Sequence, residues 1–557
     1  MPAASRRPLG LVSGLVLVLA ACGAPPAMTG GTGGSEGTTA GSMTAATSDG
    51  GTTGDASTTA DSEGTMGETT TADTLPLPLP PLDAAPLTDS QTLRPAHAAE
   101  DVTASLDPRD PADLDALLDM GFGDLEVGPG EPLIERTGDG SEPPTPGPNA
   151  ALLTRFVHLA DTQIVDDESP IRQALFDTPG ILAPVFRAQE TYACQITNAA
   201  IRTINAIHGA TPLDFVLLGG DNADNAQENE LSWFLGILDG AAVVHCDSGD
   251  DDDPVAGPAN DPKDPFAPVG LDVPWWWVTG NHDLLANGFR TAASQGAAAV
   301  GDSSVEGTRD WSQPGGPVIT GPVVGDPRRA IVDNDRLLEL VAASGDGHGI
   351  DDEVRARGRA DYTFDVDGTP LRFLVVDSAA PKGGPVGVIR GADVDAYIEP
   401  ALVDAAADGK WVLVVSHHPA GDLGDGGGPG GEAIADALTS AEWEALLGAH
   451  DRVIAHLVGH SHEHRARWVE PLGGHAYWEV TTAAIADFPH QMRLVEIGDG
   501  DNGHLSLRLT AVDLAIDGDA LGAAGKARAV ADHTSGWSMD GSGTTDDRNV
   551  VLWAPLP

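Results

Sequence analysis

Runs of four to six mostly apolar residues recur along the chain, and each run ends in polar residues. Such short runs, bounded by turn-forming residues, predict buried β-strands. The spacing of Ile196, Ala200, Ile204 and Ile207 predicts a helix over residues 185–208, and a second helix is expected over residues 225–239. The strand-forming runs are Phe156–Ala160, Phe215–Leu218, Trp275–Val278, Leu371–Val376, Trp411–Val415 and Val453–Val458.

The order of these elements predicts the fold class. Strands that alternate with helices indicate an α/β architecture. Beyond Gly474, three predicted strands follow closely at residues 476–481, 491–497 and 505–512, which indicates an antiparallel part of a second sheet.

Five polar clusters follow the predicted strands. In α/β sheets, the carboxyl ends of the strands carry the sites, so we expect the clusters to meet. Together they offer carboxylates, an amide and imidazoles, which can hold two metal ions. The clusters are Asp161-Thr162-Gln163, Gly220-Asp221-Asn222, Gly280-Asn281-His282-Asp283, His417-His418-Pro419 and Gly459-His460-Ser461-His462.

In this order, the five motifs resemble those of the calcineurin-like metallophosphoesterase superfamily, which includes purple acid phosphatases and many bacterial phosphodiesterases. The resemblance covers about residues 156–512. It implies a four-layer α/β/β/α sandwich with two mixed β-sheets and a metal site at the C-terminal strand ends. It also implies a dinuclear-metal phosphoesterase that hydrolyses phosphomonoesters or phosphodiesters by attack of a metal-bridging hydroxide.

The resemblance assigns a role to each site residue. Asp221 would bridge the two metals. His282 would protonate the leaving oxygen, and Asp283 would orient His282. Such a pair is typical of general acid–base catalysis. The remaining ligands would be Asp161, Gln163 and His462 for the first metal, and Asn281, His417 and His460 for the second.

Gln163 departs from the usual family pattern, in which His holds this position and Gln appears in some branches. An amide oxygen is a harder ligand than imidazole, so it favours Fe or Mn over Zn. Gln163 could instead hydrogen-bond a metal-bound water. The departure also supports an alternative function, a surface-binding lipoprotein that keeps the fold with little or no turnover.

Other histidines and arginines near the motifs receive lesser roles. We interpret His418 as a supporting residue, His158 as a packed residue, and His464 as solvent-facing or supporting. Four arginines are candidates to hold a second phosphate or carboxylate, although surface salt bridges are the favoured alternative: Arg172, Arg290, Arg328 and Arg329.

The start of the chain predicts export. Arg6 and Arg7 precede the apolar run Leu9–Ala21, which is too short to span a bilayer and is typical of a signal peptide. Cys22 directly follows this run and resembles the lipidated Cys of a bacterial lipoprotein. The alternative is an ordinary secretory signal with an incidental Cys. We therefore expect an anchored protein that faces the periplasm or the cell exterior.

Composition limits the partners. The formal net charge is -54, which disfavours nucleic acids because their binding needs basic residues. A phosphate ester is the expected substrate, and a lipid anchor is the expected link to the membrane. Two cysteines remain besides Cys22, and export permits a disulfide between Cys194 and Cys246. A buried Cys194 and an unpaired Cys246 are the alternative.

The chain divides into predicted segments. Residues 22–95 are rich in Gly, Ser, Thr and acidic residues and predict a disordered tether. A preface with one short helix at residues 110–120 leads into the catalytic domain, whose two insertions could select substrate or be tolerated surface loops. The segments are signal 1–21, tether 22–95, preface 96–150, domain 151–515 with insertions near 247–272 and 292–361, and C-terminal extension 516–557.

Overall fold

The computed structural model describes residues 76–180, 185–249, 257–345, 347–427 and 431–557. The predicted signal peptide, Cys22 and the tether up to residue 75 lie outside the described residues. The described residues belong to one folded unit. Among them, no helix has the length and apolarity needed to cross a membrane.

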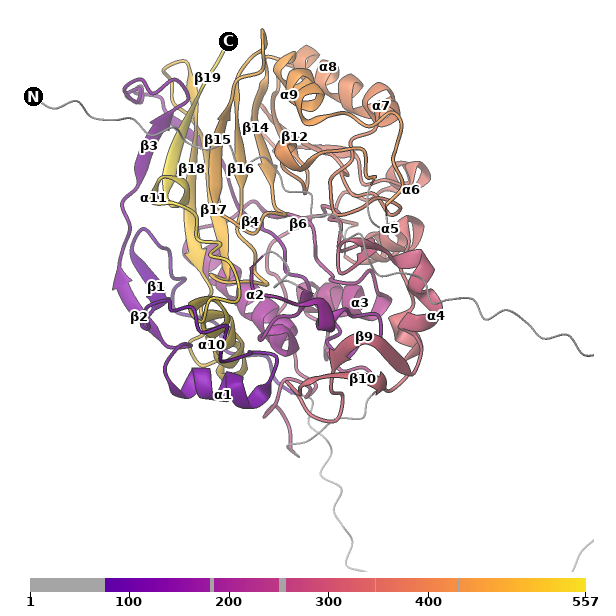
Figure 1. Cartoon of the computed structure of the whole chain (residues 1–557). Coiled ribbons are helices and arrows are strands. Elements are labelled where there is room, and N and C mark those ends of the chain that lie inside the picture. Colours follow the sequence, from indigo (N-terminus) through magenta and orange to yellow (C-terminus); the bar gives the residue numbers. More distant parts are fainter. Residues whose placement is uncertain (1–75, 181–184, 250–256, 346, 428–430) are drawn as a thin grey trace, which may run out of the picture. The chain divides into compact units, whose positions relative to one another are not determined.

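Two mixed sheets form the centre of the unit (Figure 1). In the first sheet, β4, β5 and β6 are parallel, whereas β17, β18 and β19 pair antiparallel. Its order is β3 (Ile134–Thr137), β19 (Val550–Pro555), β18 (His504–Asp513), β17 (Gln491–Asp499), β4 (Ala151–Leu159), β5 (Phe215–Leu218) and β6 (Trp275–Trp276).

The second sheet has a parallel centre and antiparallel strands at both edges. Its order is β11 (Tyr362–Asp365), β12 (Leu371–Val375), β13 (Trp411–Val415), β14 (Val453–Val458), β16 (Tyr477–Thr481) and β15 (Arg465–Val469). The predicted α/β class with two mixed sheets is confirmed.

Aromatic side chains pack between the two sheets. Phe156 stacks on Phe215 with ring centroids 4.8 Å apart, and Phe373 from the second sheet meets both edge-on at 5.5 and 5.4 Å. Because these side chains are buried on strands of both sheets, they join the sheets into one hydrophobic core.

Helices complete the layers. Figure 1 shows α8 and α9 beside the second sheet, where Leu402 and Trp443 join a buried cluster with Val414. Helix α2 contacts both α3 and α10, and α10 in turn contacts α1. The helices are α1 (Pro111–Asp119), α2 (Ala193–Ala210), α3 (Glu228–Leu238), α4 (Gly296–Ala299), α5 (Asn334–Ala343), α6 (Asp352–Arg357), α7 (Gly391–Asp393), α8 (Glu399–Ala407), α9 (Ser440–Gly448), α10 (Ala520–Thr534) and α11 (Thr545–Arg548).

Several predicted boundaries change. The tether cannot extend to residue 95, because β1 (Gln91–Pro95) pairs with β2 (Leu125–Pro129) and the Thr88 hydroxyl donates to Ala511 O. Residues 516–557 are no appendage, since α10 contacts α2 and β19 inserts between β18 and β3. The helix predicted from residue 185 begins at Ala193.

The second insertion has its own structure. It contains the hairpin β9 (Ser303–Arg309) and β10 (Val318–Pro322), together with α4, α5 and α6. Just before it, β7 (Leu285–Ala286) and β8 (Arg290–Thr291) form a small hairpin that follows the Asn281 cluster. This insertion therefore starts at the site itself.

Candidate metal centre

The five predicted clusters meet at one edge of the paired sheets. Backbone hydrogen bonds join the turns: Asp161 N donates to Gly220 O at 3.0 Å, and Gly459 N donates to His417 O at 2.9 Å. Asp161, Asp221 and His460 have φ values of 53°, 53° and 67°. Such left-handed backbone is costly for residues with a Cβ and concentrates at functional sites. The turns thus hold these three residues in a strained backbone conformation that directs their side chains toward one another.

His417, Asn281, His460 and Asp221 form one donor group. His417 Nε2 lies 3.0 Å from Asp221 Oδ2 and 3.1 Å from Asn281 Oδ1, and His460 Nδ1 lies 3.1 Å from the same amide oxygen. His417 Nδ1 faces Gly219 O at 2.8 Å, which leaves Nε2 turned toward the other donors. Partners of this kind fix the ring orientation of metal-binding histidines.

Burial and neighbouring charges shift the pKa values of this donor group. Burial lowers the pKa of His417, but the carboxylates of Asp221 and Asp161 and the Gly219 carbonyl together outweigh burial and raise it to about 9. Burial would raise the pKa of Asp221, yet His417 and His282 hold it well below its usual range. Burial and the nearby His417 lower the pKa of His460 to about 3. A neutral imidazole and an ionised carboxylate are the forms that bind metals.

Asp161 and His462 form the other half of the centre. His462 Nε2 lies 3.3 Å from Asp161 Oδ1, and His462 Nδ1 lies 2.6 Å from Asp487 Oδ2. Burial lowers the pKa of His462, but Asp161 and Asp487 raise it to about 10. Asp161, Asp221 and His417 each place a ligand atom within 4.8 Å of the others. The donor group of Asp161 and His462 therefore adjoins the donor group of Asp221 and His417.

Gln163 has a partner that the sequence did not predict. Its Oε1 accepts a hydrogen bond from Arg187, and its Nε2 lies 3.5 Å from Asp221 Oδ2. Arg187 is buried and also pairs with Asp487 and Asp224. Because this oxygen already accepts from Arg187, the ligand role of Gln163 stays a prediction.

His282 is paired with Asp224 instead of Asp283. His282 Nδ1 lies 3.0 Å from Asp224 Oδ1, whereas the Asp283 carboxylate accepts hydrogen bonds from the backbone N–H groups of Asn222, Ala223 and Gly280. The predicted orienting role of Asp283 is therefore wrong. Asp283 instead holds the loops together, and burial together with Asp221 raises its pKa to about 7.

Sequence reasoning missed Asp224, Arg187 and Asp487. Asp224 had a usable signal, because it follows Asp221 by three residues in the same turn. Arg187 and Asp487 had none, since they come from loops before α2 and after β16 and meet only in the folded chain.

The other three histidines near the motifs are buried and have partners of their own. His418 lies near His417 and His460, but its Nδ1 pairs with Ser378 Oγ at 2.8 Å and its Nε2 with Pro385 O at 3.2 Å. Burial, with the nearby His460, lowers its pKa well below the usual value. His158 is packed in the core as predicted. His464 is fully buried and accepts from Ala483 N, so a solvent-facing position is wrong.

None of the four candidate arginines lines the pocket that His282 and His462 border. Arg172 pairs with Glu190 and Arg329 with Asp166, and both are fully buried, so surface salt bridges are wrong for these two. The other two pairs are Arg290 with Glu306 and Arg328 with Asp326.

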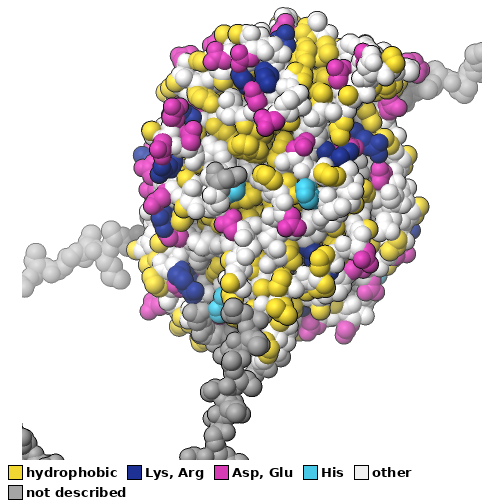
Figure 2. All heavy atoms as spheres, turned by 180° about the vertical axis from the view of Figure 1, so that it is seen from behind, with side chains coloured by type: hydrophobic (Ala, Val, Ile, Leu, Met, Phe, Trp, Pro, Cys, Tyr) yellow, Lys and Arg dark blue, Asp and Glu magenta, His cyan; other side chains and the backbone are white. Residues whose placement is uncertain are grey.

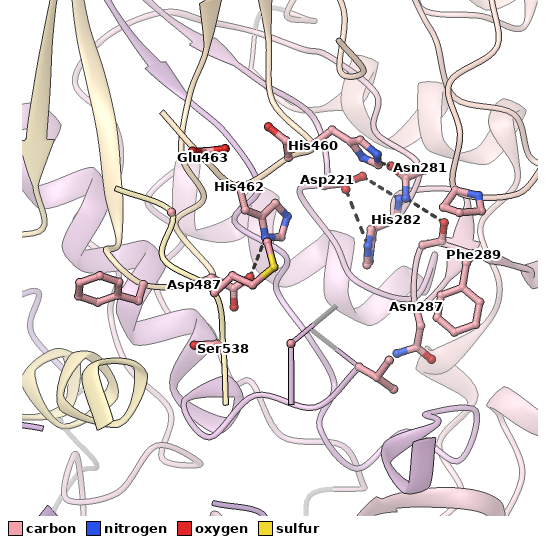
Figure 3. Close-up of a pocket in the computed structure, with 18 of the residues that line it drawn as sticks. Asp221, Asn281, His282, Asn287, Phe289, His460, His462, Glu463, Asp487 and Ser538 are labelled. Atoms are coloured by element: carbon pink, nitrogen blue, oxygen red, sulfur yellow. Dashed lines mark hydrogen bonds and ion pairs between the residues drawn. The ribbon is translucent and has the colours of Figure 1, made fainter. Parts of the chain in front are cut away.

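A pocket of about 270 Å³ opens over the donors (Figure 3). Asn281, His282 and Phe289 lie on one side of it, and His462, Asp487 and Ser538 lie on the other. On the molecular face shown in Figure 2, basic side chains occur only in small separate groups among acidic and apolar ones.

The calcineurin-like phosphoesterase family model matches residues 154–464. The chain belongs to this family. Membership implies a dinuclear metal site, and the Asp and His groups described above supply candidate ligands.

Two solved structures are similar to part of the chain at low sequence identity. A dimetal phosphatase from Danio rerio is 13% identical with a TM-score of 0.35, covering 66% of this chain and all (100%) of that one. A purple acid phosphatase from yellow lupin (Lupinus luteus) seeds is 13% identical with a TM-score of 0.30, covering 66% of this chain and 52% of that one. No curated protein sequence matches.

Proposed function

We propose that this metallophosphoesterase hydrolyses phosphomonoesters or phosphodiesters at a dinuclear metal centre. One observation carries the proposal: His282, with Asp224 behind it, faces the pocket beside the converged Asp161, Asp221, Asn281 and histidine donors. A proton donor next to a cluster of metal-binding atoms is the arrangement that phosphoester hydrolysis needs.

The donors fit two metal ions. Carboxylate and amide oxygens and imidazole nitrogens are ligands for Fe, Mn and Zn. When bound, the ions would neutralise charge on the phosphoryl group and lower the pKa of the attacking water. Oxygen ligation by Gln163 would favour Fe or Mn, whereas the histidine donors also suit Zn.

His282 is the proposed proton donor to the leaving oxygen. Its Nδ1 faces the Asp224 carboxylate, so Nε2 is the nitrogen that is directed away from this pair. Burial lowers the pKa of His282, but Asp221 and Asp224 outweigh burial and raise it. These two carboxylates therefore stabilise the protonated ring, the form that can deliver a proton.

Export and lipid anchoring belong to the same proposal. The sequence of residues 1–22 supports them, and the disulfide between Cys194 and Cys246 suits an oxidising compartment. Fatty-acid labelling of intact cells tests the anchor: wild type should be labelled, and Cys22→Ala should not.

A non-catalytic surface-binding lipoprotein is the second candidate. One observation favours it: Arg187 donates a hydrogen bond to the amide oxygen of Gln163. Its positive charge also pairs with Asp487, the partner of His462. Such a cation repels a metal ion and weakens its binding unless Asp487 and Asp224 neutralise the positive charge. The number of ions bound per chain separates the two candidates.

Hydrolysis assays with matched variants test the proposed activity. Purified protein with added Mn should hydrolyse 4-nitrophenyl phosphate or bis(4-nitrophenyl) phosphate. Asn281→Ala and His282→Ala should lower the rate by at least about a hundredfold, whereas His450→Ala, which lies outside the pocket, is the control. Equal rates for wild type and the Asn281 and His282 variants would refute the proposal.

A further inference from the structure

The small hairpin of β7 and β8 carries its turn into the wall of the pocket. The turn spans residues 287–289, a few positions after the Asn281 cluster. Asn287 and Gly288 line the pocket together with Asn281 and His282. Figure 3 shows Asn281, His282 and Asn287 on the same side of this pocket. A turn outside the five predicted clusters therefore borders the candidate centre.

The carbonyl of Gly288 orients the amide of Asn281. Asn281 Nδ2 donates a hydrogen bond to Gly288 O at 2.8 Å. The amide oxygen is thereby turned toward the other donors, where it lies 3.1 Å from both His417 Nε2 and His460 Nδ1. Loss of a partner that holds a ligand in its binding orientation typically lowers metal affinity by about 10–100-fold. Gly288 is thus placed to act on a metal ion through Asn281.

Gly288 also lies against the ring of His282. An ideal Cβ at this position would be 2.1 Å from His282 Nε2 and 2.6 Å from Asn281 Nδ2, which is far inside van der Waals contact. The φ angle of Gly288 is 70°, a left-handed conformation that glycine adopts without steric cost. Glycine therefore lets the turn approach both side chains without displacing the nitrogen that is proposed to donate the proton.

Two further contacts hold the turn in place. Asn287 N donates to Asn225 Oδ1 at 3.1 Å, and Asn225 directly follows Asp224, which pairs with the proposed proton donor. Ala286, the residue before the turn, joins a buried cluster with Ala299 of α4 in the second insertion. The position of the turn is thus set both by the loop of Asp224 and by the second insertion.

We propose that Gly288 is a positioning residue of the catalytic centre. Its carbonyl fixes the Asn281 amide in the orientation of a metal ligand, and its lack of a side chain keeps the His282 ring in place to donate a proton. This inference rests on the proposed function. Because Gly288 offers no side chain to the reaction, its effect is expected in metal affinity through Asn281 and in leaving-group protonation through His282.

A matched pair of glycine variants tests the effect on metal affinity. Gly288→Ala introduces the clash. Gly368→Ala places nearly the same left-handed strain (φ 73°) in the turn between β11 and β12, where no described atom beyond the chain neighbours lies within 4 Å of the new Cβ. In calorimetric titration of the stripped protein with Mn, Gly288→Ala should bind one of the two ions about tenfold or more weakly. Gly368→Ala should bind both ions as wild type does.

Kinetics at saturating Mn test the effect on His282. Under this condition the weaker ion is bound as well, so the loss of rate that remains reports on proton donation. We expect kcat of Gly288→Ala to fall by about tenfold or more for an alkyl phosphate, and by less for 4-nitrophenyl phosphate, whose leaving group needs little protonation. Gly368→Ala should keep the wild-type ratio of the two kcat values.

If Gly288→Ala does not fold, as judged by circular dichroism, hydrogen exchange of the wild-type protein takes its place. Coupling is reciprocal, so a turn that strengthens Mn binding is itself stabilised by bound Mn. Gly288 N donates to Leu285 O at 3.2 Å, and Phe289 N donates to Ala286 O at 3.3 Å. Exchange of these two amides should slow by about tenfold when Mn binds, whereas exchange in the hairpin of β11 and β12 should not change.

The outcomes separate this inference from the proposed function. Equal Mn affinities of Gly288→Ala and wild type, or equal losses in both glycine variants, overturn the positioning role and leave the phosphoesterase standing. Exchange of the turn that does not respond to Mn also overturns it. Equal falls in kcat for the two substrates overturn the part assigned to His282. If wild type binds two Mn ions but hydrolyses neither ester, the proposed function fails, and the Mn affinities still decide whether Gly288 positions Asn281.

Discussion

Nδ1 of His282 lies 3.0 Å from Oδ1 of Asp224, a residue 58 positions earlier in the chain. The neighbouring Asp283 points instead into a set of backbone N–H groups. The proposed proton donor is therefore oriented by the loop that carries Asp221, so the metal donor and the acid–base pair are positioned together.

Replacing Asp224 should affect poor leaving groups most. With Asp221, Asp224 is one of the two carboxylates that raise the pKa of His282, so Asp224→Asn should impair proton delivery. We expect losses in kcat of about a hundredfold for an alkyl phosphate and of at most about tenfold for a nitrophenyl phosphate, which needs little protonation. Steady-state kinetics with both substrates measures this, and equal losses would contradict the assignment.

Asp283→Asn is the matched comparison. Because its carboxylate accepts several backbone N–H bonds, the change should lower the free energy of unfolding by about 1–3 kcal/mol. Denaturant unfolding measures this effect. The ratio between alkyl and aryl substrates should stay at the wild-type value, unlike that of Asp224→Asn.

Changing Gln163 should alter the metal preference. Gln163→His supplies an imidazole, so the ratio of bound Zn to bound Mn should rise, whereas Gln163→Ala should lose metal from the group of Asp161 and His462. Metal analysis after equilibration with both ions measures this. If neither variant changes the metal content, Gln163 serves only as the partner of Arg187.

The disulfide should stabilise the region between α2 and the first insertion. Cys194 and Cys246 are separated by 52 residues in sequence, and closing a loop of this size is worth about 2–4 kcal/mol. Cys194→Ser/Cys246→Ser should lower the free energy of unfolding by this amount, measured by chemical denaturation. An unchanged midpoint, with wild type shown to be oxidised by thiol titration, would be contrary evidence.

Asp177 should make stability depend on pH. Burial, followed by the charge of Asp532, raises the pKa of Asp177 to about 8, and its Oδ1 is buried without a partner. Because the folded pKa is raised, this group's contribution to stability is complete below about pH 4 and is lost as pH rises through about 8. Asp177→Asn should therefore raise the melting temperature more at pH 8 than at pH 5. Asp119→Asn, at an exposed helix end, is the control. A shift of equal size at the two pH values would argue against the raised pKa.

Much of the fold could be predicted because local patterns carry it. Apolar runs such as Phe215–Leu218 end at turns that can hold polar side chains, so the strands and the donors appear together in sequence. The place of β19 could not be predicted, because pairing with β18 and β3 depends on contacts far apart in the chain.

The candidate site was likewise only partly predictable from the sequence. Asp161, Asp221, Asn281, His417, His460 and His462 converge as the motifs predict. The partners of His282 and Gln163 come from Asp224 and Arg187, whose approach is set by loop conformation and buried charge pairing. A neighbour in sequence was a poor guide to a neighbour in space at Asp283.

The count of bound metal ions against the rate of hydrolysis tests the central claim most directly. Protein stripped with a chelator should be inactive, and activity with bis(4-nitrophenyl) phosphate should return as the bound Mn approaches about two ions per chain. Full activity of the stripped protein would contradict the account. Fewer than one bound ion per folded chain, with no turnover, would also contradict it and would favour the non-catalytic lipoprotein.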